Sequence, residues 1–256
     1  MLEMRGIQKY FPGVHALDDC RFDLRAGEVH ALVGENGAGK STLMKILSGV
    51  YVRDGGTVTL DGREINVRDT LEAQHLGISI IHQEINLMQD LTVSENIYIG
   101  REPTRGLLLN QSRQDAQTNA LLDSLHLSDI RAGTRVRTLT VAKQQMVEIA
   151  KALSFSNTRI LIMDEPTAAL TESEIEDLFS FIRRLKAQGV GIVYISHRME
   201  ELRVIADRVT VMRDGRYVDT RNMADVTMDD IISMMVGRVI YEQPKTHSAV
   251  PQDAPV

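Results

Sequence analysis

The sequence predicts an α/β fold with a parallel β-sheet core, a small antiparallel β-sheet formed by its first strands, and a helical insert. Three observations support this fold class. An apolar strand over 29–33 leads into a glycine-rich loop that opens a helix. Two continuous apolar runs, at 159–164 and 191–196, flank a helix in the βαβ arrangement of a parallel, doubly wound sheet. Between about 91 and 153 the strand pattern gives way to helical spacing.

The overall composition is that of a globular protein. The chain has 256 residues, of which 43% are hydrophobic and 25% charged, and this is enough for a sizeable core. Its net charge is −6 and it has no long basic run, which argues against a nucleic-acid partner and against electrostatic docking on anionic lipid. Cys20 is the only cysteine, so an internal disulfide is excluded. No run of about 18 apolar residues is present to span a membrane.

The first part of the chain predicts the antiparallel sheet. Residues 2–9 are typical of an edge strand, and residues 20–24 form a second strand. Residues 57–60 are followed by Asp61 and Gly62, and an Asp-Gly pair after an alternating strand is a strong signal for a β-hairpin. We therefore expect these strands to pair with one another beside the core sheet.

The rest of the chain alternates strands and helices around the core. Residues 173–187 predict the clearest helix, because Leu178, Ile182 and Leu185 recur at helical spacing between charged residues, and Gly189 ends the pattern. The other predicted elements are a buried strand at 77–84, helices at 94–99, 112–125 and 141–155, a closing hairpin at 209–218 and a last short helix at 228–235.

The glycine-rich loop has the pattern of a phosphate-binding loop, which is Gly, four residues, Gly-Lys-Ser/Thr. Glycines allow the backbone N–H groups to fold around phosphate oxygens, and the helix that follows points the positive end of its dipole at the anion. Lys40 supplies a cation for the β- and γ-phosphates, and the Ser41 hydroxyl is a candidate Mg²⁺ ligand. The loop consists of Gly34, Glu35, Asn36, Gly37, Ala38, Gly39, Lys40, Ser41 and Thr42.

Polar side chains follow three predicted core strands. Asp164 and Glu165 follow the strand at 159–164, where the first is a candidate Mg²⁺ ligand and the second a candidate base for water. Gln83 and His197 end two other strands, within expected reach of the metal, the water or the γ-phosphate. Each residue alone has a plain structural alternative, such as an acidic pair that merely ends a strand. Their convergence at one edge of a sheet, beside a phosphate loop, favours the functional interpretation.

The order of these motifs resembles that of an ATP-binding cassette (ABC) ATPase. The phosphate loop, Gln83, the segment 139–145, the segment 163–167 and the Ser196-His197 pair follow one another as in that family. The resemblance covers about residues 2–238. Longer stretches are similar to the first cassette of bacterial sugar-import ATPases, which carry two cassettes in one chain; these stretches are 11–17, 34–42, 144–153 and 234–238.

This resemblance implies a P-loop NTPase (RecA-like) parallel sheet core with an N-terminal antiparallel β subdomain and a helical subdomain. We expect one nucleotide-binding domain over 1–240, with its helical subdomain at about 88–155. Residues 241–256 are rich in proline and in small or polar residues, and they predict a linker or a disordered tail. Because a tandem importer would begin its second cassette near this point, we expect the chain to be a fragment of a longer protein.

The resemblance also implies a role for each matched residue. Phe11 matches an aromatic residue that stacks on adenine, and a core or turn aromatic is the alternative. Gln83 matches the glutamine that senses nucleotide and faces the membrane partner. Glu165 matches the catalytic carboxylate, and His197 matches the switch histidine. Residues 167–171 match the loop that crosses between two cassettes.

The family's signature, Leu-Ser-Gly-Gly-Gln, is altered in this chain. Its counterparts after Leu139 are Thr140, Val141, Ala142 and Lys143. Thr140 keeps a hydroxyl group that can contact a γ-phosphate, whereas Ala142 adds a methyl group where glycine allows close approach of the backbone. Lys143 places a positive charge in the first turn of a helix, which the helix dipole disfavours, although this charge can also attract phosphate. The resemblance implies that this segment serves the ATP of a partner cassette. The crossing loop has Thr171 where the family has aspartate.

The motifs and the resemblance together predict an ATP-hydrolysing subunit, with ATP and Mg²⁺ at the phosphate loop, that energises sugar import through an ABC transporter. The implied partners are a second ABC cassette, in the same full-length chain or as a homodimer, a membrane permease and, indirectly, a sugar-binding protein. The implied location is peripheral, on the cytoplasmic face of the inner membrane.

One alternative is a soluble ABC-type ATPase that acts on ribosomes or DNA, which the net negative charge and the short helical insert disfavour. The other is a low-turnover, nucleotide-binding regulatory module, which the altered signature allows.

Overall fold

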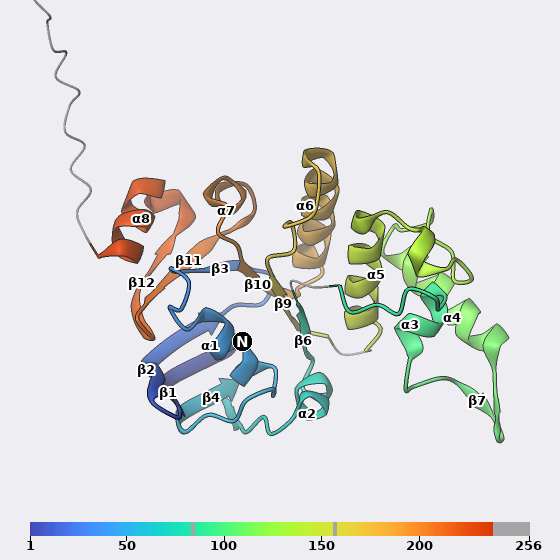
Figure 1. Ribbon diagram of the computed structural model, residues 1–256, viewed down its shortest axis with the longest axis horizontal. Helices are drawn as coiled ribbons and strands as arrows, with labels where there is room; N and C mark the ends of the chain where they lie inside the picture. The colour runs from blue at the N-terminus through green and yellow to red at the C-terminus, as the bar shows by residue number, and fades with distance from the viewer. Residues whose placement is uncertain (83–84, 156–157, 238–256) are drawn as a thin grey trace, which may run out of the picture.

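The computed structural model describes residues 1–82, 85–155 and 158–237, and it confirms the predicted α/β fold (Figure 1). Within these residues, a six-stranded sheet forms the centre and a four-stranded antiparallel sheet lies beside it. The bounds predicted for the domain (1–240), for its helical subdomain (about 88–155) and for the tail (241–256) stay predictions, and residues 238–256 lie outside the described part. In chain order the strands and α-helices are β1 (Leu2–Phe11), β2 (Val14–Leu24), β3 (Val29–Val33), α1 (Lys40–Leu47), β4 (Gly55–Leu60), β5 (Arg63–Ile65), α2 (Thr70–His75), β6 (Ile78–Ile81), α3 (Val93–Tyr98), β7 (Thr104–Arg105), β8 (Leu108–Leu109), α4 (Gln111–Ser124), α5 (Val141–Leu153), β9 (Ile160–Asp164), α6 (Glu172–Ala187), β10 (Gly191–Ile195), α7 (Met199–Ile205), β11 (Arg208–Arg213), β12 (Arg216–Asn222) and α8 (Met228–Val236).

The central sheet places the ends of its parallel strands at one edge. Among the described residues its strand order is β12-β11-β3-β10-β9-β6, in which the neighbours from β11 to β6 are parallel and β12 is antiparallel to β11. The closing hairpin predicted at 209–218 is therefore confirmed as the β11–β12 pair. Because β3 lies between β11 and β10, the loop that follows β3 is flanked by the loops that follow both neighbours.

The inner strands of the central sheet are buried on both faces, which explains the continuous apolar runs. Leu161 and Met163 of β9 belong to the hydrophobic core that includes residues of α5, α6 and α7. Ile160 and Ile162 belong to a second core, which includes residues of α1 and the antiparallel sheet. Successive side chains of a strand point to opposite faces, so a strand with both faces covered has no polar face. All four side chains are fully buried.

The antiparallel sheet corrects the predicted position of the first strand. Sequence analysis places an edge strand at 2–9, but β1 lies inside the sheet, whose order in the described chain is β2-β1-β4-β5. It pairs with β2 on one side and with β4 on the other. The prediction is wrong because the alternation of side chains reports the two faces of a strand and carries no information about its neighbours. The hairpin at Asp61 and Gly62 is confirmed as the β4–β5 pair.

The helical insert is confirmed with one small exception. Its helices α3, α4 and α5 correspond to the predicted ones, and α3 begins with a capping box in which Thr92 and Glu95 each accept from the other's backbone N–H. The exception is the hairpin of the two-residue strands β7 and β8, which lies where the sequence predicts no strand and projects from the helices (Figure 1). The three leucines at 107–109 are exposed on this hairpin. Because the hairpin buries no apolar face, no alternating pattern reveals it.

His30 of β3 is a buried ionisable side chain of the core. Its ring is fully buried, its Nε2 atom lies 2.8 Å from the hydroxyl oxygen of Thr210, and it packs against the ring of Phe22. Burial lowers the pKa of His30 to about 4, and the positive charge of Arg208 acts in the same direction. The imidazole is therefore neutral in the folded protein near neutral pH.

The free energy of unfolding should consequently fall as the pH is lowered from about 6.5 to about 4. An unfolded histidine has a pKa of about 6.5, so in this window the unfolded state binds a proton that the folded state does not. The two pKa values differ by about 2.5 units, which corresponds to a loss of about 3 kcal/mol. Urea unfolding across this window measures the effect. A His30→Asn variant should lose less stability over the same interval, and an equal loss in both proteins would contradict the expectation.

Candidate functional site

The glycine-rich loop joins β3 to α1 in a conformation that requires glycine. Gly39 is the N-cap residue of α1 and has a φ of 98°, in the left-handed region. A Cβ atom on Gly39 would lie 2.7 Å from Cδ2 of Leu17 and 3.0 Å from the carbonyl oxygen of Ala16. Glycine is therefore needed at this position for both the backbone angle and the available space. The N-terminus of α1 then points the positive end of its dipole at the loop.

Lys40, the first residue of α1, reaches back across the loop. Its Nζ atom donates to the carbonyl oxygens of Gly34, at 2.6 Å, and Glu35, at 3.0 Å. Burial lowers the pKa of Lys40, while the carboxylates of Glu165 and Asp164 act in the opposite direction. The two carbonyl oxygens thus hold the ammonium group at the loop. Charged phosphate oxygens are stronger acceptors than carbonyl oxygens, so a phosphate group could replace them as the partner of Lys40.

A cavity of about 410 Å³ lies over the loop and is lined by its residues 36–42. The backbone N–H of Gly215 donates to the carbonyl oxygen of Ala38 at 3.2 Å, so the β11–β12 turn supports the loop. Sequence analysis predicts this turn within the closing hairpin at 209–218 but does not place it at the site, because only the β11–β3 pairing brings it there. The lining residues outside the loop, all missed by the sequence reasoning, are Val14, His15, Ala16, Asp214 and Gly215.

Glu165 and His197 meet where β9 and β10 end. Oε2 of Glu165 lies 2.5 Å from Nδ1 of His197, and 73% of the His197 side chain is exposed. Glu165 has a φ of 52°, a left-handed conformation that costs a residue with a Cβ atom about 1–2 kcal/mol. The surrounding structure must hold such a residue in place, and strained residues of this kind cluster at functional sites. The structure thus brings together the two side chains that the sequence analysis singled out for hydrolysis.

Asp164 is the last residue of β9 and is half-buried. Burial raises the pKa of Asp164 and the charge of Glu165 raises it further, while Lys40 acts in the opposite direction. A nearby cation stabilises a carboxylate in these surroundings. With the Ser41 hydroxyl in the first turn of α1, Asp164 supplies the oxygen ligands that Mg²⁺ prefers, and water and phosphate complete such sites.

The roles of all the predicted site residues stay predictions, and two of these residues are not placed at the loop cavity by the described structure. Gln83 lies outside the described residues, although β6, which leads to it, is the neighbour of β9 in the sheet. Phe11 ends β1, and its ring centroid lies 5.2 Å from that of Tyr51 in an edge-on contact. The ammonium group of Lys9 lies 5.4 Å from the same ring. On this side of the loop, residues 14–16 line the cavity and Phe11 does not.

The altered signature segment stands at the N-terminus of α5. The Thr140 hydroxyl caps the helix by accepting from the backbone N–H of Lys143 at 3.3 Å. The ammonium group of Lys143 forms an ion pair with Asp129 at 2.8 Å, which offsets its unfavourable interaction with the helix dipole. Ala142 is buried, and Val141 is exposed. The segment is therefore a stable, capped helix start despite its departures from the family pattern.

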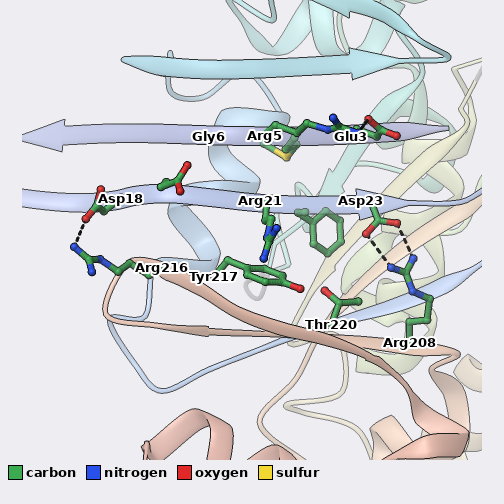
Figure 2. Close-up of a pocket in the computed structure, with 13 residues that line it drawn as sticks. Glu3, Arg5, Gly6, Asp18, Arg21, Asp23, Arg208, Arg216, Tyr217 and Thr220 are labelled. Atoms are coloured by element: carbon green, nitrogen blue, oxygen red, sulfur yellow. Dashed lines mark hydrogen bonds and ion pairs between the residues drawn. The ribbon is translucent and has the colours of Figure 1, made fainter.

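A larger cavity, of about 1010 Å³, lies away from the loop, between β1, β2 and β12 (Figure 2). None of the residues that line it belongs to the phosphate loop. Figure 2 shows that Arg216 faces Asp18 and Arg208 faces Asp23 across the cavity. Arg208 donates to Asp23 at 2.7 and 2.8 Å, Arg216 pairs with Asp18, and the guanidinium of Arg21 lies 4.0 Å from the ring centroid of Tyr217.

A family model described as "ABC transporter" matches residues 17–168, which is more than half of the chain. The chain belongs to the ABC transporter family. The match begins in β2 and ends after the Asp164-Glu165 pair, so this ABC cassette contains its phosphate loop, its altered signature and its strand-end carboxylates within the matched segment.

Curated relatives of this ABC cassette are import ATP-binding proteins by name. The putative ribose/galactose/methyl galactoside import ATP-binding protein 2 of Burkholderia cenocepacia (strain HI2424) is 61% identical over 96% of this chain and 48% of its own length. A similarly named protein of Albidiferax ferrireducens is 55% identical over 96% of this chain and 49% of its own length. The chain thus spans about half the length of the curated relatives it matches.

Solved structures similar to this ABC cassette are cassettes of ABC transporters. The ADP conformation of one such cassette has a TM-score of 0.78 and 26% identity, over 92% of this chain and 94% of that one. A dimeric bacterial ABC transporter cassette has a TM-score of 0.71 and 25% identity, over 87% of this chain and 99% of that one. Across the described part of the chain, no helix has both the length and the apolar character needed to cross a membrane.

Proposed function

We propose that this ABC cassette binds and hydrolyses ATP and energises sugar import as the ATP-binding subunit of an ABC transporter. The observation that carries the proposal is the meeting of the phosphate loop and the Glu165–His197 pair at one edge of the central sheet. The names of the relatives support a sugar of the ribose, galactose or methyl galactoside type. Because the chain spans about half of those relatives, the activity of the whole protein is part of the proposal.

The bound nucleotide would lie with its phosphates against residues 34–42 and its adenine against Phe11. Lys40 would exchange its two loop carbonyls for β- and γ-phosphate oxygens. Ser41 and Asp164 would hold Mg²⁺, with Gln83 as a further ligand. When bound, the ion neutralises charge on the phosphate oxygens.

Glu165 and His197 would promote the attack of water on the γ-phosphate. Glu165 would accept a proton from the water, and the 2.5 Å contact with Nδ1 of His197 orients its carboxylate. The His197 side chain is largely exposed, and the ring nitrogen that does not contact Glu165 would hydrogen-bond the γ-phosphate. A base and its orienting histidine beside a phosphate loop favour an enzyme over a module that only binds nucleotide.

The proposed partners of the cassette rest on its family and on the dimeric cassette among the similar solved structures. Residues 140–143 would serve the ATP of a second ABC cassette, either in the full-length chain or in a homodimer. Helices α3, α4 and α5 would contact a membrane permease, and the cassette would then lie peripherally on the cytoplasmic face of the inner membrane. A sugar-binding protein would act on it indirectly, through the permease. No nucleic-acid partner is proposed.

Reconstitution in vesicles tests the proposal. The cassette, in its full-length chain, is combined with candidate permeases, and phosphate release is measured with and without sugar and its binding protein. Sugar-dependent ATP turnover is the expected result. ATP turnover at the same rate with and without permease and sugar would favour a soluble ABC-type ATPase. ATP binding without phosphate release would favour the regulatory module.

A further inference from the structure

One buried carboxylate accepts hydrogen bonds from both loops that carry the Glu165–His197 pair. Glu201 lies in the first turn of α7 and is 6% exposed. Four side chains donate to its two oxygens: the hydroxyls of Thr167 at 2.8 and 2.9 Å, Tyr194 at 2.9 Å and Ser196 at 3.0 Å, and the guanidinium of Arg198 at 3.3 Å.

These donors stand on both sides of the pair. Thr167 belongs to the loop that begins with Glu165, while Ser196 and Arg198 flank His197 in the chain. The Ser196 hydroxyl oxygen also accepts from the backbone N–H of Arg198 at 3.0 Å, which folds the His197 segment into a tight turn. Thr167 and Ser196 are 2% and 3% exposed, so their bonds to the carboxylate are shielded from water and correspondingly strong.

The conformation of Glu165 makes such support necessary. Its φ of 52° is disfavoured for a residue with a Cβ atom, so the chain on either side must be held. One tie is the hydrogen bond from the backbone N–H of Glu165 to the carbonyl oxygen of Ile195 at 2.9 Å, which joins the end of β9 to the end of β10. The bonds to Glu201 join the same two loops a second time. A shift in either loop would change the 2.5 Å contact between Glu165 and His197.

We propose that Glu201 is a positioning residue for ATP hydrolysis, which sets the Glu165–His197 contact by binding the loops after β9 and β10 to one carboxylate. This inference rests on the proposed function. Glu201 would not touch the nucleotide, and its effect would pass through the two loops. A carboxylate suits the role because it offers only acceptors, and all four partners present donors.

The Glu201→Gln variant tests the proposal because it keeps the shape of the side chain. Its amide group places an N–H donor where one of the partner hydroxyls or the guanidinium now donates. We expect kcat for ATP to fall about 10-fold to 100-fold, because catalytic groups displaced by a fraction of an ångström lose much of their effect. The KM and the dissociation constant for ATP should change less than about twofold, since the phosphate loop is untouched. In a Glu165→Gln background the same change should cause no further loss of kcat.

Two smaller variants separate positioning from general structural support. Thr167→Val and Tyr194→Phe each remove one hydroxyl donor to Glu201, but Thr167 follows Glu165 in its loop, whereas Tyr194 lies within β10. If Glu201 is a positioning residue, Thr167→Val should reduce kcat more than Tyr194→Phe does, even where the two variants lose similar thermal stability. This comparison also decides the matter if Glu201→Gln does not fold.

Two outcomes would overturn the inference on its own. One is wild-type kcat in Glu201→Gln, and the other is a fall in kcat that only follows the fall in stability across all variants. A wild-type protein that binds ATP without hydrolysing it would instead overturn the proposed function, and this inference with it.

Discussion

Replacing Glu165 with glutamine is expected to reduce ATP turnover at least about 100-fold while ATP binding is retained. Glutamine has nearly the shape of glutamate, so it should keep the contact with Nδ1 of His197 and the conformation of the loop after β9. Its amide cannot take a proton from water, so the general base is lost. Phosphate release gives the turnover, and calorimetry with Mg·ATP gives the affinity.

A matched control uses a carboxylate of the same charge outside the site. Glu172, in the first turn of α6, is exposed, and Glu172→Gln should leave both turnover and affinity near the wild-type values. If Glu165→Gln hydrolyses ATP at the wild-type rate, Glu165 loses its proposed role, and the base must lie elsewhere.

The Lys40→Ala variant should bind ATP at least about 100-fold more weakly than the wild type, because hydrogen bonds between a cation and a phosphate are worth about 3 kcal/mol when partly buried. The structure gives a second reason for a large effect. The Lys40 ammonium group donates hydrogen bonds to the carbonyl oxygens of Gly34 and Glu35, so its removal also destabilises the conformation of the phosphate loop. Calorimetric titration of the folded variant with Mg·ATP measures the loss.

Lys45 provides the control for this variant. It lies on the same helix, α1, and its ammonium group is 5.5 Å from the ring centroid of Tyr51. Lys45→Ala removes the same charge from the same helix, yet it should bind ATP with nearly unchanged affinity. Full affinity in Lys40→Ala would mean that the glycine-rich loop does not hold the phosphates as proposed.

Local patterns were enough to predict most elements of the fold. The apolar runs of β9 and β10 and the helical spacing of α6 appear in the structure where they were expected, because burial on two faces or on one stripe leaves a periodic trace in the sequence. The β7–β8 hairpin left no such trace, since it buries no apolar face. The place of β1 inside its sheet was missed because its second neighbour, β4, comes from a distant part of the chain.

In the candidate site, too, local features were predicted from the sequence and contacts between distant segments were missed. The phosphate loop is one continuous segment, so residue types and spacing were sufficient to find it. The cavity wall at Asp214 and Gly215 was missed because it reaches the loop only through the pairing of β11 with β3. Glu201 was missed as well, although a charged residue beside the buried Leu202 of a short helix is a weak signal of a buried, paired carboxylate.

The sequence by itself determined which groups are available for the proposed chemistry: a glycine-rich loop with the phosphate-binding pattern, carboxylates at strand ends and a histidine after the next strand. Such features are encoded locally, because each needs only particular residue types at fixed spacing along a strand, turn or helix. Only the tertiary structure decided which of these groups touch, as in the 2.5 Å contact of Glu165 with His197 and the convergence of two loops on Glu201. Contacts between segments distant in the chain depend on the order and register of the strands, and these are set by the packing of the whole sheet.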